Sequence, residues 1–143
     1  MGKTEEKIEI ILAQWQTCVE MANSISQRRD AMNNIFVTIN LAILATLSFS
    51  WDIKAIMILV AGTAICILWS LFIRNFKMLN AEKFKVINEL EESLPATPFK
   101  EEWECLQKNK RYKDGTVLEM ILPIMFMILY IIAISVIVIL QIN

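Results

Sequence analysis

Three long stretches without a single Asp, Glu, Lys or Arg constrain this chain more than any other feature. They cover residues 31–51, 55–73 and 120–143 of the 143-residue sequence. A helix needs roughly 20 apolar residues to cross the hydrocarbon core of a bilayer. The first stretch carries several Asn, Ser and Thr residues, whereas the other two are more apolar. We therefore predict an all-α integral membrane protein with three transmembrane helices, at 31–51, 55–73 and 120–142.

The remaining residues are also predicted to be helical. Residues 4–27 repeat apolar side chains at spacings of three and four, which is typical of an amphipathic helix, and residues 1–30 are expected to form one such segment. Residues 74–94 continue as a helix out of the membrane, Pro95 and Pro98 bracket a turn, and residues 99–110 form a short helix. Residues 74–119 are thus expected to form a helical loop between the second and third spans.

The distribution of Lys and Arg predicts the orientation of the spans. Four of these residues precede the first span and nine lie between the second and third, whereas one lies in the short turn and none follows the third span. Because Lys and Arg concentrate on the cytoplasmic side, the N-terminus and residues 74–119 are expected in the cytoplasm and the C-terminus outside. Trp51, Trp69 and Tyr112 are expected near the membrane interfaces, and Glu119 is expected to cap or pair.

Composition and missing motifs argue against several classes of function. The formal net charge is -1 and there is no His. A balanced charge argues against nucleic acid as a partner, and the lack of His removes the commonest general base and metal ligand. The three cysteines are widely spaced and fit neither a zinc site nor a disulfide framework. Nucleotide-binding and hydrolase motifs are missing as well. We predict no enzyme, with no catalytic residue, metal or cofactor.

The first span carries polar side chains that need partners in hydrocarbon. Asn40 lies near the middle of the span and, with Asn34 and Thr38, forms a predicted polar strip. Two interpretations stay open. In the first, the strip lines a pore, and in the second, it contacts a neighbouring helix. Small residues recur every four positions in the first two spans, a spacing that lets helices approach closely within a chain or between subunits. The pore or helix-packing candidates are Asn34, Thr38, Asn40, Thr46, Gly62 and Cys66.

The amphipathic N-terminal helix needs a partner for its apolar stripe. Helices that bind anionic membranes usually carry Lys or Arg on the polar face, whereas here that face is acidic, with Glu5, Glu6 and Glu9. Contact with protein is therefore favoured over contact with anionic lipid. Because three spans bury little surface against one another, we predict that the chain homo-oligomerises.

A longer pattern resembles a known family. Its parts are Arg74–Lys77, Ala81–Glu91, Leu94-Pro95, Pro98-Phe99, Glu102-Trp103, Tyr112–Asp114 and Glu119–Pro123, which are similar to the RipA-type family of small bacterial octameric membrane proteins. The resemblance covers roughly residues 30–140. The resemblance implies a ring of subunits in the bacterial inner membrane, with an octamer as one expected size. Proteins of this kind also look like anti-phage effectors, which sense a phage component and then permeabilise the membrane. The hairpin of two spans is also similar to the SLATT pore-forming effectors, from which the third span departs.

These observations together predict a homo-oligomeric phage-defence effector. Its cytoplasmic region is expected to assemble subunits or to sense a trigger such as a phage protein, and its spans are expected to permeabilise the bilayer. The alternative is a non-conducting scaffold or accessory subunit of another membrane complex, which a monomer or a one-to-one heteromer would support. The assembly or sensing candidates are Trp15, Lys83, Phe84 and Trp103.

Overall fold

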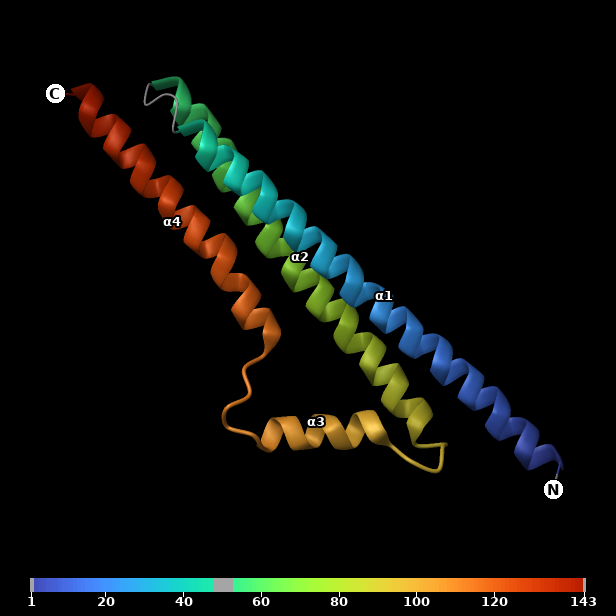
Figure 1. Ribbon diagram of the computed structural model, residues 1–143. Coiled ribbons are helices and arrows are strands. Elements are labelled where there is room, and N and C mark those ends of the chain that lie inside the picture. Colours follow the sequence, from blue (N-terminus) through green and yellow to red (C-terminus); the bar gives the residue numbers. More distant parts are fainter. Residues whose placement is uncertain (1, 48–52, 143) are drawn as a thin grey trace. The chain divides into compact units, whose positions relative to one another are not determined.

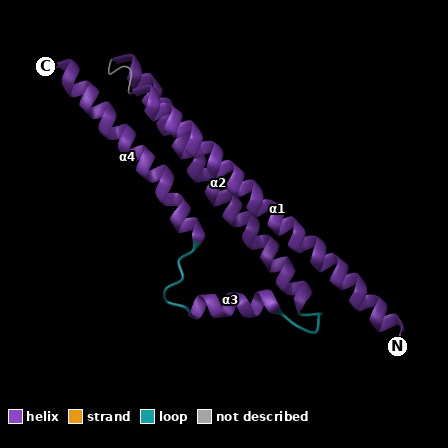
Figure 2. Cartoon of the chain, in the orientation of Figure 1, coloured by secondary structure: helices purple, strands orange, loops and turns teal. Residues whose placement is uncertain are grey.

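Four helices account for most of the computed structural model, which describes residues 2–47 and 53–142. They are α1 (Gly2–Leu47), α2 (Ile53–Glu91), α3 (Pro98–Lys108) and α4 (Gly115–Ile142), and no strand occurs in these ranges (Figures 1 and 2). The predicted all-α fold class is confirmed. Residues 48–51 of the first predicted span, with Trp51 among them, lie outside the described residues.

Three of the helices, α1, α2 and α4, are long and apolar enough to cross a membrane, as the sequence predicts. Both α1 and α2 continue well beyond their apolar stretches, because no Gly or Pro breaks either helix there. The chain leaves helical geometry after Glu91, ahead of Pro95, and α3 starts with Pro98 at its first position, where a missing N–H costs nothing.

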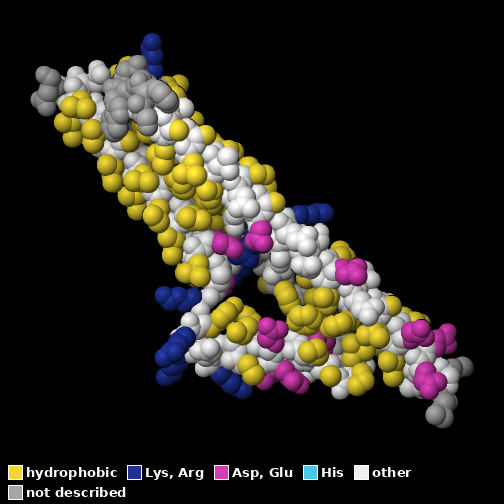
Figure 3. All heavy atoms as spheres, viewed as in Figure 1, with side chains coloured by type: hydrophobic (Ala, Val, Ile, Leu, Met, Phe, Trp, Pro, Cys, Tyr) yellow, Lys and Arg dark blue, Asp and Glu magenta, His cyan; other side chains and the backbone are white. Residues whose placement is uncertain are grey.

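The chain divides into two compact units. The charged unit comprises Met1–Arg28 and Phe76–Lys113, and the apolar unit comprises Arg29–Asn75 and Asp114–Asn143. The division after Arg28 falls just before the first charge-free stretch begins, and the division after Asn75 falls just after the second one ends. Figure 3 shows the same contrast in the side chains, since yellow hydrophobic atoms cover α4 and most acidic atoms lie on the charged unit.

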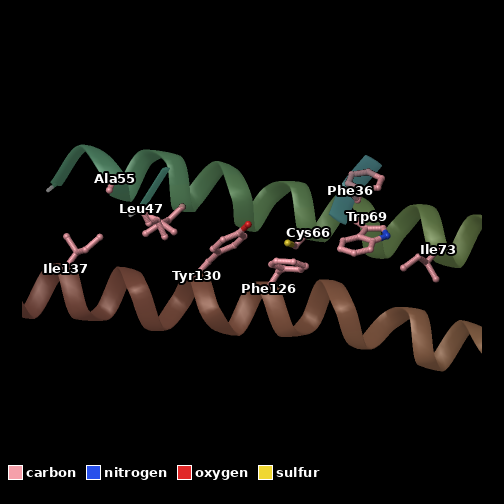
Figure 4. Close-up of a cluster of buried hydrophobic side chains, with 10 residues drawn as sticks. Phe36, Leu47, Ala55, Cys66, Trp69, Ile73, Phe126, Tyr130 and Ile137 are labelled. Atoms are coloured by element: carbon pink, nitrogen blue, oxygen red, sulfur yellow. The ribbon is translucent and has the colours of Figure 1, made fainter. Parts of the chain in front are cut away.

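The core of the apolar unit is a cluster of large side chains from α1, α2 and α4 (Figure 4). Trp69 stacks on Phe36, with ring centroids 5.6 Å apart and planes 7° from parallel. Its indole Nε1 donates a hydrogen bond to Oδ1 of Asn33 at 2.8 Å. Trp69 is only 1% exposed, so it packs between helices. The expectation that it anchors the chain at the lipid interface is therefore wrong. The sequence shows that Trp69 lies near the end of the second charge-free stretch, but only the fold shows that the ring of Phe36 stacks on it.

Gly62 permits a close approach between α2 and the ring of Tyr130 on α4. A Cβ atom built on Gly62 would lie 2.8 Å from Cε2 of Tyr130, which is shorter than any ordinary contact between carbon atoms. Figure 4 shows Tyr130 pointing from α4 towards α2 at this level. Gly62 therefore serves packing within the chain, which is one of the two interpretations left open by the sequence.

We expect Gly62→Val to destabilise the apolar unit, because the new side chain would displace the ring of Tyr130. Overpacking of this kind typically costs about 1–3 kcal/mol. Thermal unfolding of the detergent-solubilised protein, followed by circular dichroism, measures the change in Tm. Ala64→Val is the matched control, since Ala64 is exposed on the same helix. Equal Tm values for the two variants would contradict the close packing of α2 on α4.

Candidate functional site

A buried amide joins the three helices of the apolar unit. Asn40 on α1 is fully buried, and its Nδ2 donates to the carbonyl oxygen of Phe36 at 2.7 Å. Its Oδ1 accepts two hydrogen bonds, from the hydroxyl of Tyr130 on α4 at 2.6 Å and from Sγ of Cys66 on α2 at 3.1 Å. One side chain therefore connects α1, α2 and α4.

The hydrogen bonds of Asn40 explain how a polar residue is tolerated at the centre of an apolar unit. In hydrocarbon there is no water to replace a missing partner, so an unsatisfied polar group costs several kcal/mol. Asn40 has protein partners on both other helices, and it therefore does not need the water of a pore. Cys66, a predicted packing candidate, is one of those partners, so its place in the structure is also inside the chain.

The predicted polar strip does not form one surface. Asn34 and Thr38 are exposed on α1, whereas Asn40 faces the other helices. The reason is helical geometry. Positions 34 and 38 are four residues apart and share one face of α1, whereas position 40 lies on a different face. What remains on the exposed side is a row of three polar residues and one alanine, spaced every four positions and called the polar stripe below: Asn34, Thr38, Ala42 and Thr46.

The hydroxyl groups of the polar stripe are already satisfied within α1. Thr38 donates to the carbonyl oxygen of Asn34 at 2.8 Å, and Thr46 donates to that of Ile43 at 2.7 Å. Such bonds let Thr face lipid, another helix or water at little cost. The side-chain amide of Asn34 has no such bond to any described residue, so it is the group on this stripe that calls for an external partner.

Tyr130 is the residue of the cluster that sequence reasoning missed. It lies on the most apolar of the spans, where aliphatic side chains surround it. A buried Tyr hydroxyl usually finds a hydrogen-bond partner, so a tyrosine in the middle of an aliphatic span was the available signal. Asn40 was the polar group in need of a partner, and the two could have been paired on chemistry alone.

An ion pair connects α1 to the start of α4. Nε of Arg29 lies 2.7 Å from Oε2 of Glu119, and Nη2 of Arg29 donates to Oγ1 of Thr116 at 3.0 Å. The two charged side chains are 16% and 26% exposed, so solvent screens the pair only in part. Asp114 caps the helix, because its Oδ1 accepts a hydrogen bond from the backbone N–H of Thr116 at 2.8 Å. The expectation that Glu119 pairs is confirmed.

Phe99 is the centre of an aromatic cluster in the charged unit. Its ring centroid lies 5.8 Å from that of Trp15 on α1 and 5.8 Å from that of Phe84 on α2. The fully buried carboxylate of Glu91 accepts hydrogen bonds from the backbone N–H groups of Phe99 and Lys100, at 3.2 and 3.3 Å. These are N–H groups of the first turn of α3, which helix geometry leaves unpaired, so Glu91 fixes α3 to α2.

The structure therefore brings together two of the four assembly or sensing candidates. Trp15 and Phe84 meet at Phe99, whereas Lys83 lies elsewhere, with its Nζ 3.8 Å from Sδ of Met21. Trp103 is 48% exposed and contacts Tyr112 edge-on.

An open apolar groove runs along α1 and α2 in the charged unit. Its volume is about 580 Å³. Val86 and Leu90 line it from the side of α2 turned away from Phe84 and Glu91, which contact α3. The other lining residues come from α1: Ile10, Ala13, Gln14, Thr17 and Cys18.

Three buried polar atoms of the charged unit lack hydrogen-bond partners among the described residues. They are Nε1 of Trp15, Oδ1 of Asn80 and Oδ1 of Asn88. Buried groups of this kind are rare in native proteins and call for an explanation. No group of three or more His, Cys, Asp or Glu side chains suited to a metal ion occurs in the part of the chain that the structure describes.

We expect the Asn40–Tyr130 hydrogen bond to couple the stabilities of two helices. Asn40→Leu and Tyr130→Phe should each destabilise the protein, and the double variant should lose less than the sum of the two. Hydrogen bonds between membrane helices contribute about 0.5–2 kcal/mol, which sets the size of the coupling. Unfolding of the protein in mixed micelles by a denaturing detergent measures it. Thr38→Val, on the exposed face of α1, is the control and should show no coupling to Tyr130→Phe.

The Arg29–Glu119 pair predicts a second coupling. Arg29→Gln or Glu119→Gln alone should lower stability by about 1–2 kcal/mol, because each leaves a partly buried charge unpaired. The exchange Arg29→Glu with Glu119→Arg should recover only part of this loss, since an arginine near the N-terminus of α4 opposes the helix dipole. Tm measurements on the four proteins check the pattern. An exchange variant less stable than both single variants would contradict a direct pair.

Most of the chain is similar to one known protein family. Residues 12–139 match the octameric membrane protein family (8xMP), a range that begins within α1, includes α2 and α3, and ends within α4. No curated protein and no solved structure showed significant similarity to the chain. The match extends over all three helices that are able to cross a membrane. The chain therefore belongs to the octameric membrane protein family.

Proposed function

We propose that this protein forms a homo-octamer in the bacterial inner membrane and permeabilises that membrane in response to a trigger, as a defence against phage. The charged unit lies in the cytoplasm and senses the trigger, and the C-terminus lies outside. The observation that carries the proposal is the exposed polar stripe on α1, a membrane-capable helix, in a chain whose family is named for octamers.

A conducting path would form between subunits. The space between α1, α2 and α4 of one chain is filled by the side chains of the apolar core, including Trp69, Phe126 and Tyr130. The side chain of Asn40 forms its hydrogen bonds with residues of that core. The exposed stripe of Asn34, Thr38, Ala42 and Thr46 remains, and in a ring each subunit would contribute one copy of it. Hydroxyls and amides are suitable linings for a water-filled passage.

The charged unit has two properties suited to sensing. Its apolar groove offers a surface for another protein, and α3 is held by a small set of contacts around Phe99 and Glu91. The unpartnered polar atoms of Trp15, Asn80 and Asn88 lie in this unit and would gain hydrogen bonds in a rearranged state. A trigger that favours such a state can shift the balance between two conformations. The resemblance to the RipA-type family supports a phage protein as that trigger.

A non-conducting scaffold is the second candidate. It is favoured by the hydroxyls of Thr38 and Thr46, which are satisfied within α1 and therefore do not require water. In that case the stripe would contact a helix of a partner membrane protein. Stoichiometry separates the two candidates, since a closed homomeric ring supports the pore and a one-to-one heteromer supports the scaffold.

The test is release of a small dye from liposomes containing the purified protein, with and without added phage structural proteins. Thr38→Leu with Thr46→Leu should reduce triggered release about tenfold, because it removes the hydroxyls of the proposed lining. Ile35→Leu with Ile39→Leu is the matched control on other exposed positions of α1 and should release dye as the unmodified protein does. Particle mass in detergent shows whether each variant still assembles. An octamer that releases no dye under any of these conditions would rule out the pore and leave the scaffold.

A further inference from the structure

Positive charge is concentrated at the last residue of α3 and in the five residues that follow it. Residues 108–113 read KNKRYK, with four cations and no acid. All four cationic side chains are exposed, and none forms an ion pair with a residue that the structure describes. Lys100, in the same unit, differs in this respect, since its Nζ lies 3.0 Å from Oε1 of Glu92 and this hydrogen bond raises the pKa of Lys100. The cations of the segment are Lys108, Lys110, Arg111 and Lys113.

A hydrogen-bonded turn orders the backbone that carries Lys110 and Arg111. The backbone N–H of Asn109 donates to the carbonyl oxygen of Leu106 at 3.1 Å, which ends α3. The carbonyl oxygen of Asn109 accepts from the N–H of Tyr112 at 2.9 Å, and its side-chain Oδ1 accepts from the N–H of Arg111 at 3.0 Å. Lys110 and Arg111 therefore occupy the two central positions of a closed turn, where side chains point to the outside.

Two aromatic residues stand beside the turn. Tyr112 contacts Trp103 of α3 edge-on, with ring centroids 6.4 Å apart and planes 87° from parallel. The two residues are 42% and 48% exposed, although both are large and apolar in part. Tyr and Trp are enriched at the head-group level of membranes, because one part of the ring is apolar and the other forms hydrogen bonds. Figure 3 shows dark blue cationic atoms gathered around the end of α3 and the loop that follows it.

Chain connectivity keeps this turn near the bilayer surface. Lys113 is separated by one residue from Gly115, where α4 begins, and α4 leads into the most apolar stretch of the protein. A fully extended chain covers at most about 3.6 Å per residue, so even Lys108 lies within about 25 Å of the start of α4. This limit follows from covalent geometry alone.

We propose that Lys108, Lys110, Arg111 and Lys113 form a binding site for the phosphate groups of anionic phospholipids, with Trp103 and Tyr112 inserted at the head-group level. Clusters of Lys and Arg next to a transmembrane helix attract anionic lipids. The guanidinium group of Arg111 matches a phosphate in a two-pronged geometry, and the ordered turn reduces the entropy lost on binding. The site is independent of whether the octamer conducts, so it extends beyond the function proposed above.

The acidic end of a second copy is the competing occupant. Glu5, Glu6 and Glu9 are exposed on α1 and would attract the same cations. The position of the turn favours lipid, because a membrane surface is present next to α4 in every state of assembly. The aromatic pair favours lipid too, since it has no role in recognising a row of carboxylates.

The test compares two variants of equal charge in the full-length, detergent-solubilised protein. Lys110→Gln with Arg111→Gln removes both cations at the tip of the turn. Lys7→Gln with Lys85→Gln removes two exposed cations of the same unit away from it. Titration with phosphatidylglycerol or phosphatidylcholine, followed by native mass spectrometry of the lipid adducts, gives the affinities. Circular dichroism and particle mass show that each variant folds and assembles.

We expect phosphatidylglycerol to bind the unmodified protein more tightly than phosphatidylcholine does. The turn variant should lose about tenfold or more of that affinity and the control variant less than about twofold, because only cations close to the head groups contribute. Lys110→Arg with Arg111→Lys should retain most of it. Equal losses in the turn and control variants would overturn the site in favour of net charge alone. Displacement of the lipid by millimolar inorganic phosphate would assign the site to a free anion, and loss of the octamer with unchanged lipid affinity would assign it to a second copy.

Discussion

The hydrogen bonds of Asn40 are the interaction on which the apolar unit depends. A bilayer offers no water to a buried amide, so every polar group inside it must find a partner in protein. Asn40 finds Tyr130 on α4 and Cys66 on α2, and Gly62 leaves the space that the ring of Tyr130 needs. Apolar contacts in lipid lack direction, whereas these bonds specify which faces of the three helices meet. The same bonds direct Asn40 inwards and leave the stripe of Thr38 outside.

The charged unit obeys the opposite rule, because water is available to its polar groups and its apolar side chains must be covered. Phe99 brings Trp15 and Phe84 together, and Glu91 supplies the capping bonds that keep α3 in place. The coverage is incomplete, since the groove along Val86 and Leu90 stays open. Membership of the octameric membrane protein family implies self-association, so other copies of the chain are available to cover this surface.

Charged side chains occur in two different settings in this chain. Arg29 and Glu119 pair inside the apolar unit, whereas the cations of residues 108–113, in the charged unit, form no ion pair with any residue that the structure describes. A pair that is partly buried stabilises one arrangement of helices, whereas exposed cations remain free to bind an external partner. Two groups of the same chemical type thus differ in whether an ion pair with a described carboxylate holds them.

The sequence by itself determined the class of this protein and the three helices able to cross a membrane, because runs without charge and the spacing of apolar residues are local properties. It also identified Asn40 as a group in need of partners. Only the tertiary structure identified those partners as Tyr130 and Cys66. Tyr130 lies 90 residues away along the chain, and the division of the polar strip into a buried Asn40 and an exposed Thr38 follows from how helices face one another. The cover that Phe36 gives to Trp69 was hidden for the same reason, since contacts between distant segments depend on packing and not on local pattern.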